Sequence, residues 1–210
     1  MFAPDSTGSV PTGMYSTLMS TADRLIEATQ ELLWERGYVG TSPKAIQQRA
    51  GAGQGSMYHH FAGKPDLALA AVLRTSEEMR ETAGRLLDGP GSAYERISAY
   101  LLREREVLKG CPVGRLTMDP DVVASDALRA PLDGTIGWLR GRLAEILQEG
   151  LKAGEFSPGI TPDEVAAAVV ATVQGGYVLA RASGSTAAFD SAVRGLLSLL
   201  APHSTSAPAV

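Results

Sequence analysis

The chain of 210 residues has little cysteine, little net charge and no strand-like alternation of apolar residues. Cys111 is its single cysteine, so an internal disulfide framework is excluded and a reducing cytosol is the expected compartment. The formal net charge of −4 argues against a protein that coats nucleic acid indiscriminately, but a specific binder needs only a local basic patch. With 44% hydrophobic residues, the chain is expected to be a soluble globular protein.

Two further absences bear on location. The first twenty residues lack the charged-then-apolar order of a signal peptide. The most apolar run, residues 165–180, is interrupted by Gln174, Gly175 and Gly176 and is short for a bilayer span. We therefore expect a cytoplasmic protein that does not have a membrane as partner.

Helical spacing of apolar residues recurs along the chain and predicts an all-α fold. We expect an N-terminal three-helix domain at 20–66 and a helical second domain at 67–202, flanked by tails at 1–19 and 203–210. The N-terminal tail is rich in Ser, Thr, Gly and Pro, which indicates disorder. In the first part of the chain, the expected helices run over 21–36, from 43 to a stop at 51, from 54 onward, over 64–87 and over 92–108. They are followed by a short helix that ends near 119, and by helices over 128–151, from 162 to about 182, and over 186–200.

The stretch 41–64 predicts two short helices joined by a glycine-containing turn. Ser42 can cap the first of them, and Pro43 sits at its first helical position, where a missing N–H costs nothing. Gly51 is placed to end that helix in a left-handed conformation. This pattern is the first half of a helix-turn-helix.

The second helix of the pair separates apolar from polar side chains. Met57 and Phe61 lie four residues apart and can face a small core, to which we also assign Ile46 and Tyr38. The other side chains between 54 and 60 then form a short outward surface of hydrogen-bonding groups. Such a surface on the second helix is what reading a DNA major groove needs.

An ordered set of short motifs covers Leu25 through Leu67: E-R-G-Y, then T-S, then I-x-x-R-A-G, then G-x-M-Y-H-H-F, then G-K-x-D-L. In this combination the chain resembles the DNA-binding domain of the TetR (tetracycline-repressor) family. The resemblance implies a homodimeric transcriptional regulator, most often a repressor, that binds a double-stranded DNA operator. It implies no cofactor, and a small, mostly apolar effector molecule that releases the operator.

The resemblance also implies which residues meet DNA. Lys44 and Lys64 are expected to contact phosphates, and Gly53 stands where the family usually has a capping Ser or Asn. Gly costs only a few tenths of a kcal/mol at a helix N-cap, but a phosphate-binding hydroxyl is lost. The full expected set is Ser42, Lys44, Gln54, Gly55, Ser56, Tyr58, His59, His60 and Lys64.

The charges of this domain nearly cancel. Five cations (Arg24, Arg36, Lys44, Arg49 and Lys64) are offset by five acids (Asp23, Glu27, Glu31, Glu35 and Asp66). The acids cluster on the first helix, which is expected to lie behind the reading surface. We therefore expect weak non-specific affinity for DNA, with specificity carried by the fit.

The second domain is expected to sense the effector and to form the dimer. In the resemblance, the last two helices form a four-helix interface with their symmetry mates, and small residues such as Gly175 let the backbones approach closely. The expected helix 64–87 begins at the DNA and ends in this domain, which makes it the natural lever. Residues in the position of the family's effector pocket, each of which also suits a core or an interface, are Tyr100, Arg115, Met118, Trp138 and Tyr177.

Several alternatives remain open or are set aside. Cys111 suits a small buried residue better than a redox sensor, although Pro112 permits a helix start beside it. His59 and His60 point about 100° apart on a helix and cannot chelate a metal together. A protein of the same fold that sequesters a small molecule is the second hypothesis. An enzyme is the third, and no motif in the sequence has catalytic spacing for it.

Overall fold

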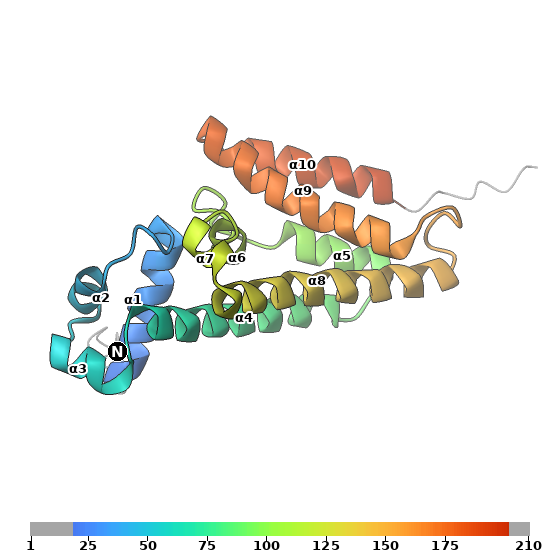
Figure 1. The fold of residues 1–210 in the computed structure, drawn as a ribbon. Helices are drawn as coiled ribbons and strands as arrows, with labels where there is room; N and C mark the ends of the chain where they lie inside the picture. The colour runs from blue at the N-terminus through green and yellow to red at the C-terminus, as the bar shows by residue number, and fades with distance from the viewer. Residues whose placement is uncertain (1–18, 202–210) are drawn as a thin grey trace, which may run out of the picture.

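The computed structural model describes residues 19–201, so the two predicted tails lie outside the described residues, apart from Met19. Within this range the chain forms ten helices and no strand, which confirms the all-α prediction (Figure 1). They are α1 (Thr21–Arg36), α2 (Pro43–Ala50), α3 (Gln54–His60), α4 (Lys64–Leu87), α5 (Ala93–Leu102), α6 (Pro112–Leu116), α7 (Pro120–Ala124), α8 (Asp126–Lys152), α9 (Pro162–Ser183) and α10 (Ala187–Leu200).

The first two helices begin and end at the predicted signals. The Ser20 Oγ accepts a hydrogen bond from the backbone N–H of Asp23, and the Ser42 Oγ accepts one from that of Ala45. Each bond satisfies one of the N–H groups that a helix start leaves without an intrahelical partner. Gly51 ends α2 with φ 59°, a left-handed conformation that glycine adopts without steric cost.

The apolar side chains form two buried clusters. The smaller joins α1, α2, α3 and the start of α4 through Leu25, Ala28, Leu32, Ile46, Ala50, Met57 and Leu67. The larger lies among α4, α5, α8, α9 and α10. Tyr38 was predicted to join the smaller cluster, and this is wrong: it packs against the larger one. Its ring instead lies 3.9 Å from the Lys64 Nζ.

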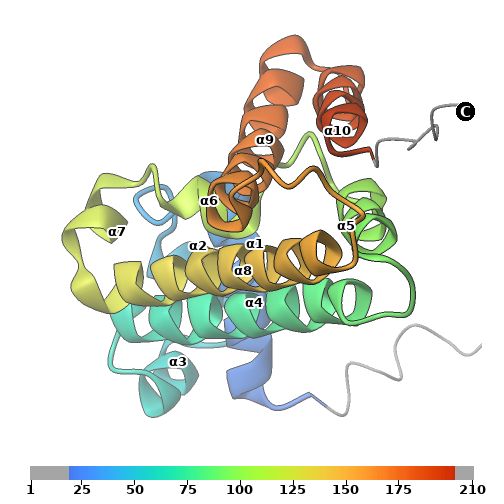
Figure 2. The same ribbon diagram turned by 90° about the vertical axis from the view of Figure 1, so that its right-hand side faces the viewer.

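The two longest helices, α4 and α8, pack against each other. Figures 1 and 2 show α4 and α8 side by side, with α9 and α10 on the side of α8 opposite α4. Figure 1 shows α2 and α3 at one end of the molecule. α4 contacts α1, α5 and α8. Gln30 donates to the Thr75 Oγ1 at 3.0 Å, and Arg74 pairs with Asp23 at 3.4 Å, so side chains join α1 to α4.

The region between α5 and α8 differs from the prediction. α5 ends at Leu102 rather than continuing to Leu108, whose side chain is 49% exposed instead of inward. The Arg105 guanidinium donates to the carbonyls of Tyr100 and Leu101 at the end of α5. A cation that binds the last carbonyls favours a helix end at that point. α6 starts at Pro112, inside the segment expected to be irregular, and α7 was not predicted.

The start of α9 lies where the sequence predicted it, but the capping side chain is not engaged. Thr161 is the N-cap of α9 and makes no side-chain capping bond. Within residues 19–201, α9 is long and apolar enough to cross a membrane by length and composition alone, a test that core helices of soluble proteins also pass. Only 33% of its most apolar stretch is buried in the single chain, so much of this helix faces outward.

Candidate nucleic-acid interface and effector cavity

α3 presents its polar side chains to solvent because one apolar side chain anchors it. Met57 is fully buried among Ile46 and the other residues of the smaller cluster, and the Gln47 Nε2 lies 3.4 Å from its sulfur. Gly53 is the N-cap and makes no side-chain bond, as expected from the missing hydroxyl. The exposed residues of α3 are Gln54, Gly55, Tyr58, His59 and His60, and Ser56 is half-buried. The predicted reading residues therefore lie together on an accessible surface.

The two predicted phosphate-binding lysines lie at helix starts. Lys44 is exposed in the first turn of α2, next to the exposed cap Ser42. Lys64 is the first residue of α4, half-buried, with its ammonium against the Tyr38 ring. A helix start offers free N–H groups and the positive end of the helix dipole, and a cation there adds to the attraction for an anion. Both positions suit a phosphate.

Two of the four acids of α1 pair with an arginine of α2. Arg49 pairs with Glu31 at 2.7 Å and with Glu35 at 2.9 Å. The hydrogen bond from Arg49 holds the pKa of Glu35 below its usual range, outweighing the opposing effect of desolvation. Two consequences follow: α2 is fixed against α1, and negative charge behind the candidate interface is partly neutralised.

The far side of the molecule exposes small and apolar residues instead. On α9 the outward positions include Ala171, Gly175, Val178 and Leu179, with Val178 68% exposed. On α10, Leu199 is 83% exposed. Apolar side chains that recur on the outward face of two adjacent helices are typical of a surface that another chain covers.

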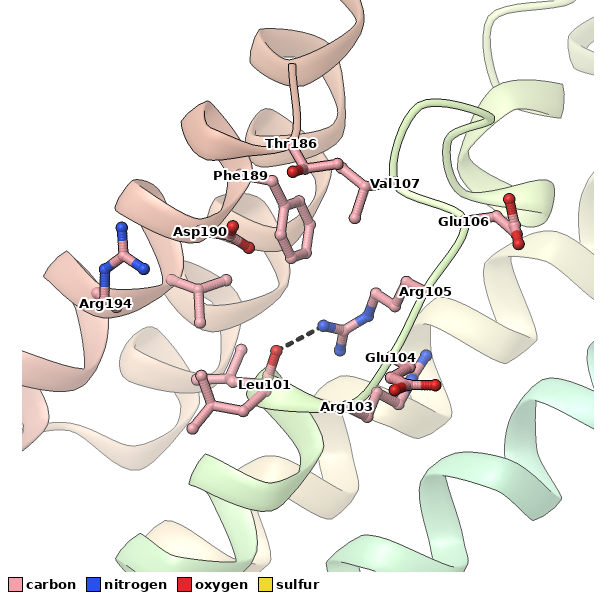
Figure 3. Close-up of a pocket in the computed structure, with 12 residues that line it drawn as sticks. Leu101, Arg103, Glu104, Arg105, Glu106, Val107, Thr186, Phe189, Asp190 and Arg194 are labelled. Atoms are coloured by element: carbon pink, nitrogen blue, oxygen red, sulfur yellow. Dashed lines mark hydrogen bonds between the residues drawn. The ribbon is translucent and has the colours of Figure 1, made fainter.

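Three hollows lie around the segment between α5 and α6. We call residues 103–106 the strap. A central cavity of about 520 Å³ lies between the strap and α1, α4, α8 and α9; Tyr100 and Tyr177 line it. A groove of about 670 Å³ separates the strap from α10 (Figure 3). A cavity of about 360 Å³ beside α6 is lined by Tyr177, Arg115 and Met118, of which Met118 is 85% exposed.

Of the five predicted pocket residues, Trp138 lies apart. It packs against the larger cluster and lines none of these three hollows. Burial raises the pKa of Tyr177 to about 12, so its hydroxyl stays protonated and can donate a hydrogen bond. Four residues that the sequence did not single out contribute to these sites: Trp34, Arg103, Arg105 and Asp119.

Two hydrogen bonds connect the cavity region to α1 and to the loop that precedes α2. The Trp34 Nε1 of α1 donates to the Gly110 carbonyl at 2.9 Å, and the backbone N–H of Val39 donates to the Asp119 carboxylate at 2.9 Å. Asp119 is buried and is also the N-cap of α7. Both bonds join segments about eighty residues apart, so no short motif could have predicted them.

Comparisons with known proteins agree with this arrangement. Residues 25–71 match the family described as "Bacterial regulatory proteins, tetR family". Residues 92–196, half of the chain, match "Tetracyclin repressor-like, C-terminal domain". The chain belongs to the TetR family. It is a DNA-binding transcriptional regulator with a helix-turn-helix domain and a helical C-terminal domain, and the family binds operator DNA as dimers.

Individual relatives of this TetR-family regulator include an uncharacterized HTH-type transcriptional regulator of Lactococcus lactis, 28% identical over 77% of this chain and 84% of its own length. LmrA of Bacillus subtilis is 27% identical over 75% and 84%. Among solved structures, a TetR regulatory protein of Rhodobacter sphaeroides superposes with a TM-score of 0.78 at 26% identity, over 86% of this chain and 100% of its own. A CifR cysteine mutant bound to a 26-base-pair operator shares the fold, with a TM-score of 0.71 at 22% identity over 85% and 95%.

Regulators of this family are typically not enzymes. Family membership therefore favours a DNA-binding regulator over an enzyme.

Proposed function

We propose that this regulator is a repressor that binds a near-palindromic operator as a homodimer and leaves it when a small molecule enters the second domain. The observation that carries the proposal is the polar, solvent-exposed surface of α3, held outward by buried Met57. A dimer that reads two successive major grooves needs its two α3 helices about 34–36 Å apart. The operator's two half-sites would share that spacing.

The dimer is proposed to form through α9 and α10. Supporting it are the exposed apolar side chains Val178, Leu179 and Leu199, and the small residues that let helices approach closely. Covering this face would also account for the low burial of α9 in the single chain. A regulator of this kind acts where its operator is, in the cytoplasm.

Release is proposed to work through the spacing of the two α3 helices. An effector in the central cavity would press on α4, and the bonds from Trp34 and Asp119 would carry the change to α1 and the following loop. Since both half-sites must be met at once, a small change of spacing weakens binding. A coupling of about 1–3 kcal/mol is enough to switch occupancy of the operator.

The experiment measures binding of the full-length protein to DNA from upstream of its own gene, by fluorescence anisotropy at physiological salt. Tyr58→Ala and Lys64→Ala should each weaken binding by about tenfold or more, since each removes a contact of about 1–3 kcal/mol. Lys152→Ala, which removes an exposed cation at the far end of α8, is the matched control. Unchanged affinity in both test variants, with the fold intact, shows that the groove assignment is wrong.

Lys44→Ala separates phosphate contact from base reading. It should weaken binding to all DNA sequences alike and lower the slope of log affinity against log salt by about 1. A loss confined to the specific operator would instead place Lys44 among the base-reading residues.

A further inference from the structure

The strap at residues 103–106 alternates arginine and glutamate in an extended segment. Successive side chains of extended backbone point to opposite sides. Accordingly Arg103 and Arg105 are half-buried, whereas Glu104 and Glu106 are exposed. The two guanidinium groups lie near the same ring, with their central carbons 4.6 and 5.4 Å from the centre of Tyr100. The strap therefore turns two cations toward the interior.

Within the described residues 19–201, these two cations form no ion pair with a carboxylate. The ion pairs formed among residues 19–201 use five other arginines, at positions 49, 74, 96, 129 and 142. Burial, and then the charge of Arg103, lower the pKa of Arg105. Two like charges that are partly withdrawn from water are stabilised by a counter-charge. The charges of Arg103 and Arg105 are therefore not neutralised by a carboxylate of residues 19–201.

Part of this arrangement has a purely structural role. Arg105 donates to the last carbonyls of α5, and Figure 3 shows it reaching across the groove below the Phe189 ring toward the Leu101 carbonyl. That role does not extend to Arg103, whose buried Nη1 finds no acceptor, nor to the Nε of Arg105, which is buried and also without one. Two donors of the pair are therefore left without an acceptor among residues 19–201.

The central cavity next to the strap is suited to an apolar body. Its wall includes Trp34, Met79, Leu139 and Val173. The Lys109 Nζ lies 4.0 Å from the centre of the Trp34 ring and adds a third cation to the lining. A volume of about 520 Å³ is within the range of small-molecule sites.

Acidic groups also line this cavity, but the principal ones are already engaged. Glu31 is paired with Arg49, and Glu78 accepts a hydrogen bond from Gln30 at 3.0 Å and lies 3.5 Å from Arg74. The remaining acids of the lining, Glu27, Glu104 and Glu106, are exposed to solvent. The net preference at the strap is therefore for a negative ligand.

We propose that the effector is a small organic carboxylate with an apolar body, whose carboxylate binds Arg103 and Arg105 while the body occupies the central cavity. This rests on the proposed function, because it gives the chemical class of the molecule that would release the operator. A carboxylate would satisfy the two free donors and neutralise the like-charged pair. An uncharged molecule of the same shape would leave both costs in place.

The test uses pairs of probes that differ only in charge: benzoate against benzamide, and hexanoate against hexanamide. Binding to the full-length protein is measured by isothermal titration calorimetry. At least one carboxylate should bind about tenfold or more tightly than its amide, the advantage expected of charge-assisted hydrogen bonds. If neither carboxylate binds, or if each amide equals its carboxylate, the proposal fails.

Three variants locate the site. Arg103→Gln should reduce carboxylate affinity to that of the amide, and Arg105→Lys should weaken it less, because a lysine keeps the charge but not the planar fork. Arg140→Gln, which removes an exposed arginine of α8, should have no effect. Arg103→Gln should leave the Tm of the free protein unchanged or raised, because it removes an unpaired cation. Carboxylate binding that survives Arg103→Gln overturns the proposal.

Operator binding measured on the same preparations separates this proposal from the proposed function. Intact operator binding without any carboxylate preference refutes only the effector class. A carboxylate that binds at the strap without weakening operator binding supports the anion site and contradicts release by that ligand.

Discussion

α3 and the outward face of α9 and α10 are both exposed in the single chain, but their chemistry is opposite. The surface of α3 carries hydroxyl, amide and imidazole groups that water solvates well. The other face carries Ala171, Gly175, Val178, Leu179 and Leu199. Exposing apolar area costs about 25 cal/mol per Å², whereas exposing polar groups to water costs little free energy. The difference in chemistry supports the proposal that each side has its own partner: DNA at α3, and a second copy of the chain at α9 and α10.

The largest expected effect comes from adding a charge to the apolar outward face of α9 and α10. Leu179→Glu and Leu199→Glu should each raise the dimer dissociation constant by about a hundredfold or more, since a buried unpaired carboxylate costs several kcal/mol. Operator affinity should fall with it, because one α3 alone meets only half of the site. Size-exclusion chromatography with light scattering measures the first effect, and anisotropy the second.

Val123→Glu is the matched control, because Val123 lies on α7 and is 50% exposed. It should remain dimeric. A Leu199→Glu protein that also remains a dimer would mean that the second copy is bound elsewhere.

A smaller effect tests whether the hydrogen bond between Val39 and Asp119 joins the N-terminal domain to the second domain. Asp119→Ala removes the acceptor of the Val39 N–H and the N-cap of α7, and should lower the free energy of unfolding by about 1–2 kcal/mol. Urea denaturation measures the loss, and hydrogen exchange should show faster exchange at the Val39 amide. Asp121→Ala, at an exposed neighbour, should change neither quantity. Equal exchange at Val39 in both variants would contradict the link.

The smallest expected effect concerns the N-cap of α3, on the polar surface. Gly53 has φ −74° with nothing within 4 Å of a Cβ added there, so Gly53→Ser fits without strain. The new hydroxyl can cap α3, and should add a few tenths of a kcal/mol of stability and raise operator affinity about twofold. Gly53→Ala is the control, because it adds the Cβ without the hydroxyl. If the alanine variant gains as much operator affinity, capping is not the cause.

Local signals were enough to predict the helix-turn-helix. Ser20, Ser42 and Gly51 are capping residues whose effect depends on neighbours within a few positions, so α1 and α2 begin and end where predicted. The same holds for the boundaries of α4. These parts of the fold depend on backbone hydrogen bonds that the sequence specifies locally.

Long-range contacts explain what the sequence did not reveal. The sequence pattern places Tyr38 in the wrong core because its partners lie in the second domain. The early end of α5 has a local cause instead, because Arg105 folds back onto carbonyls four and five residues before it. Asp119 and Trp34 bond to segments about eighty residues away. Trp138 was assigned to a pocket by its position along the chain, although its side chain packs against the core of the second domain.

α4 runs through the molecule as 24 consecutive helical residues, about 36 Å at 1.5 Å per residue. Because Gln30 and Asp23 attach α4 to α1, the N-terminal domain would move together with α4 as one rigid unit. Over that length, a rotation of only about 5° displaces one end by roughly 3 Å relative to the other. A DNA-free, effector-bound dimer would then keep every contact inside each N-terminal domain. It would fail to bind its operator because the two intact domains are no longer aligned with the two half-sites.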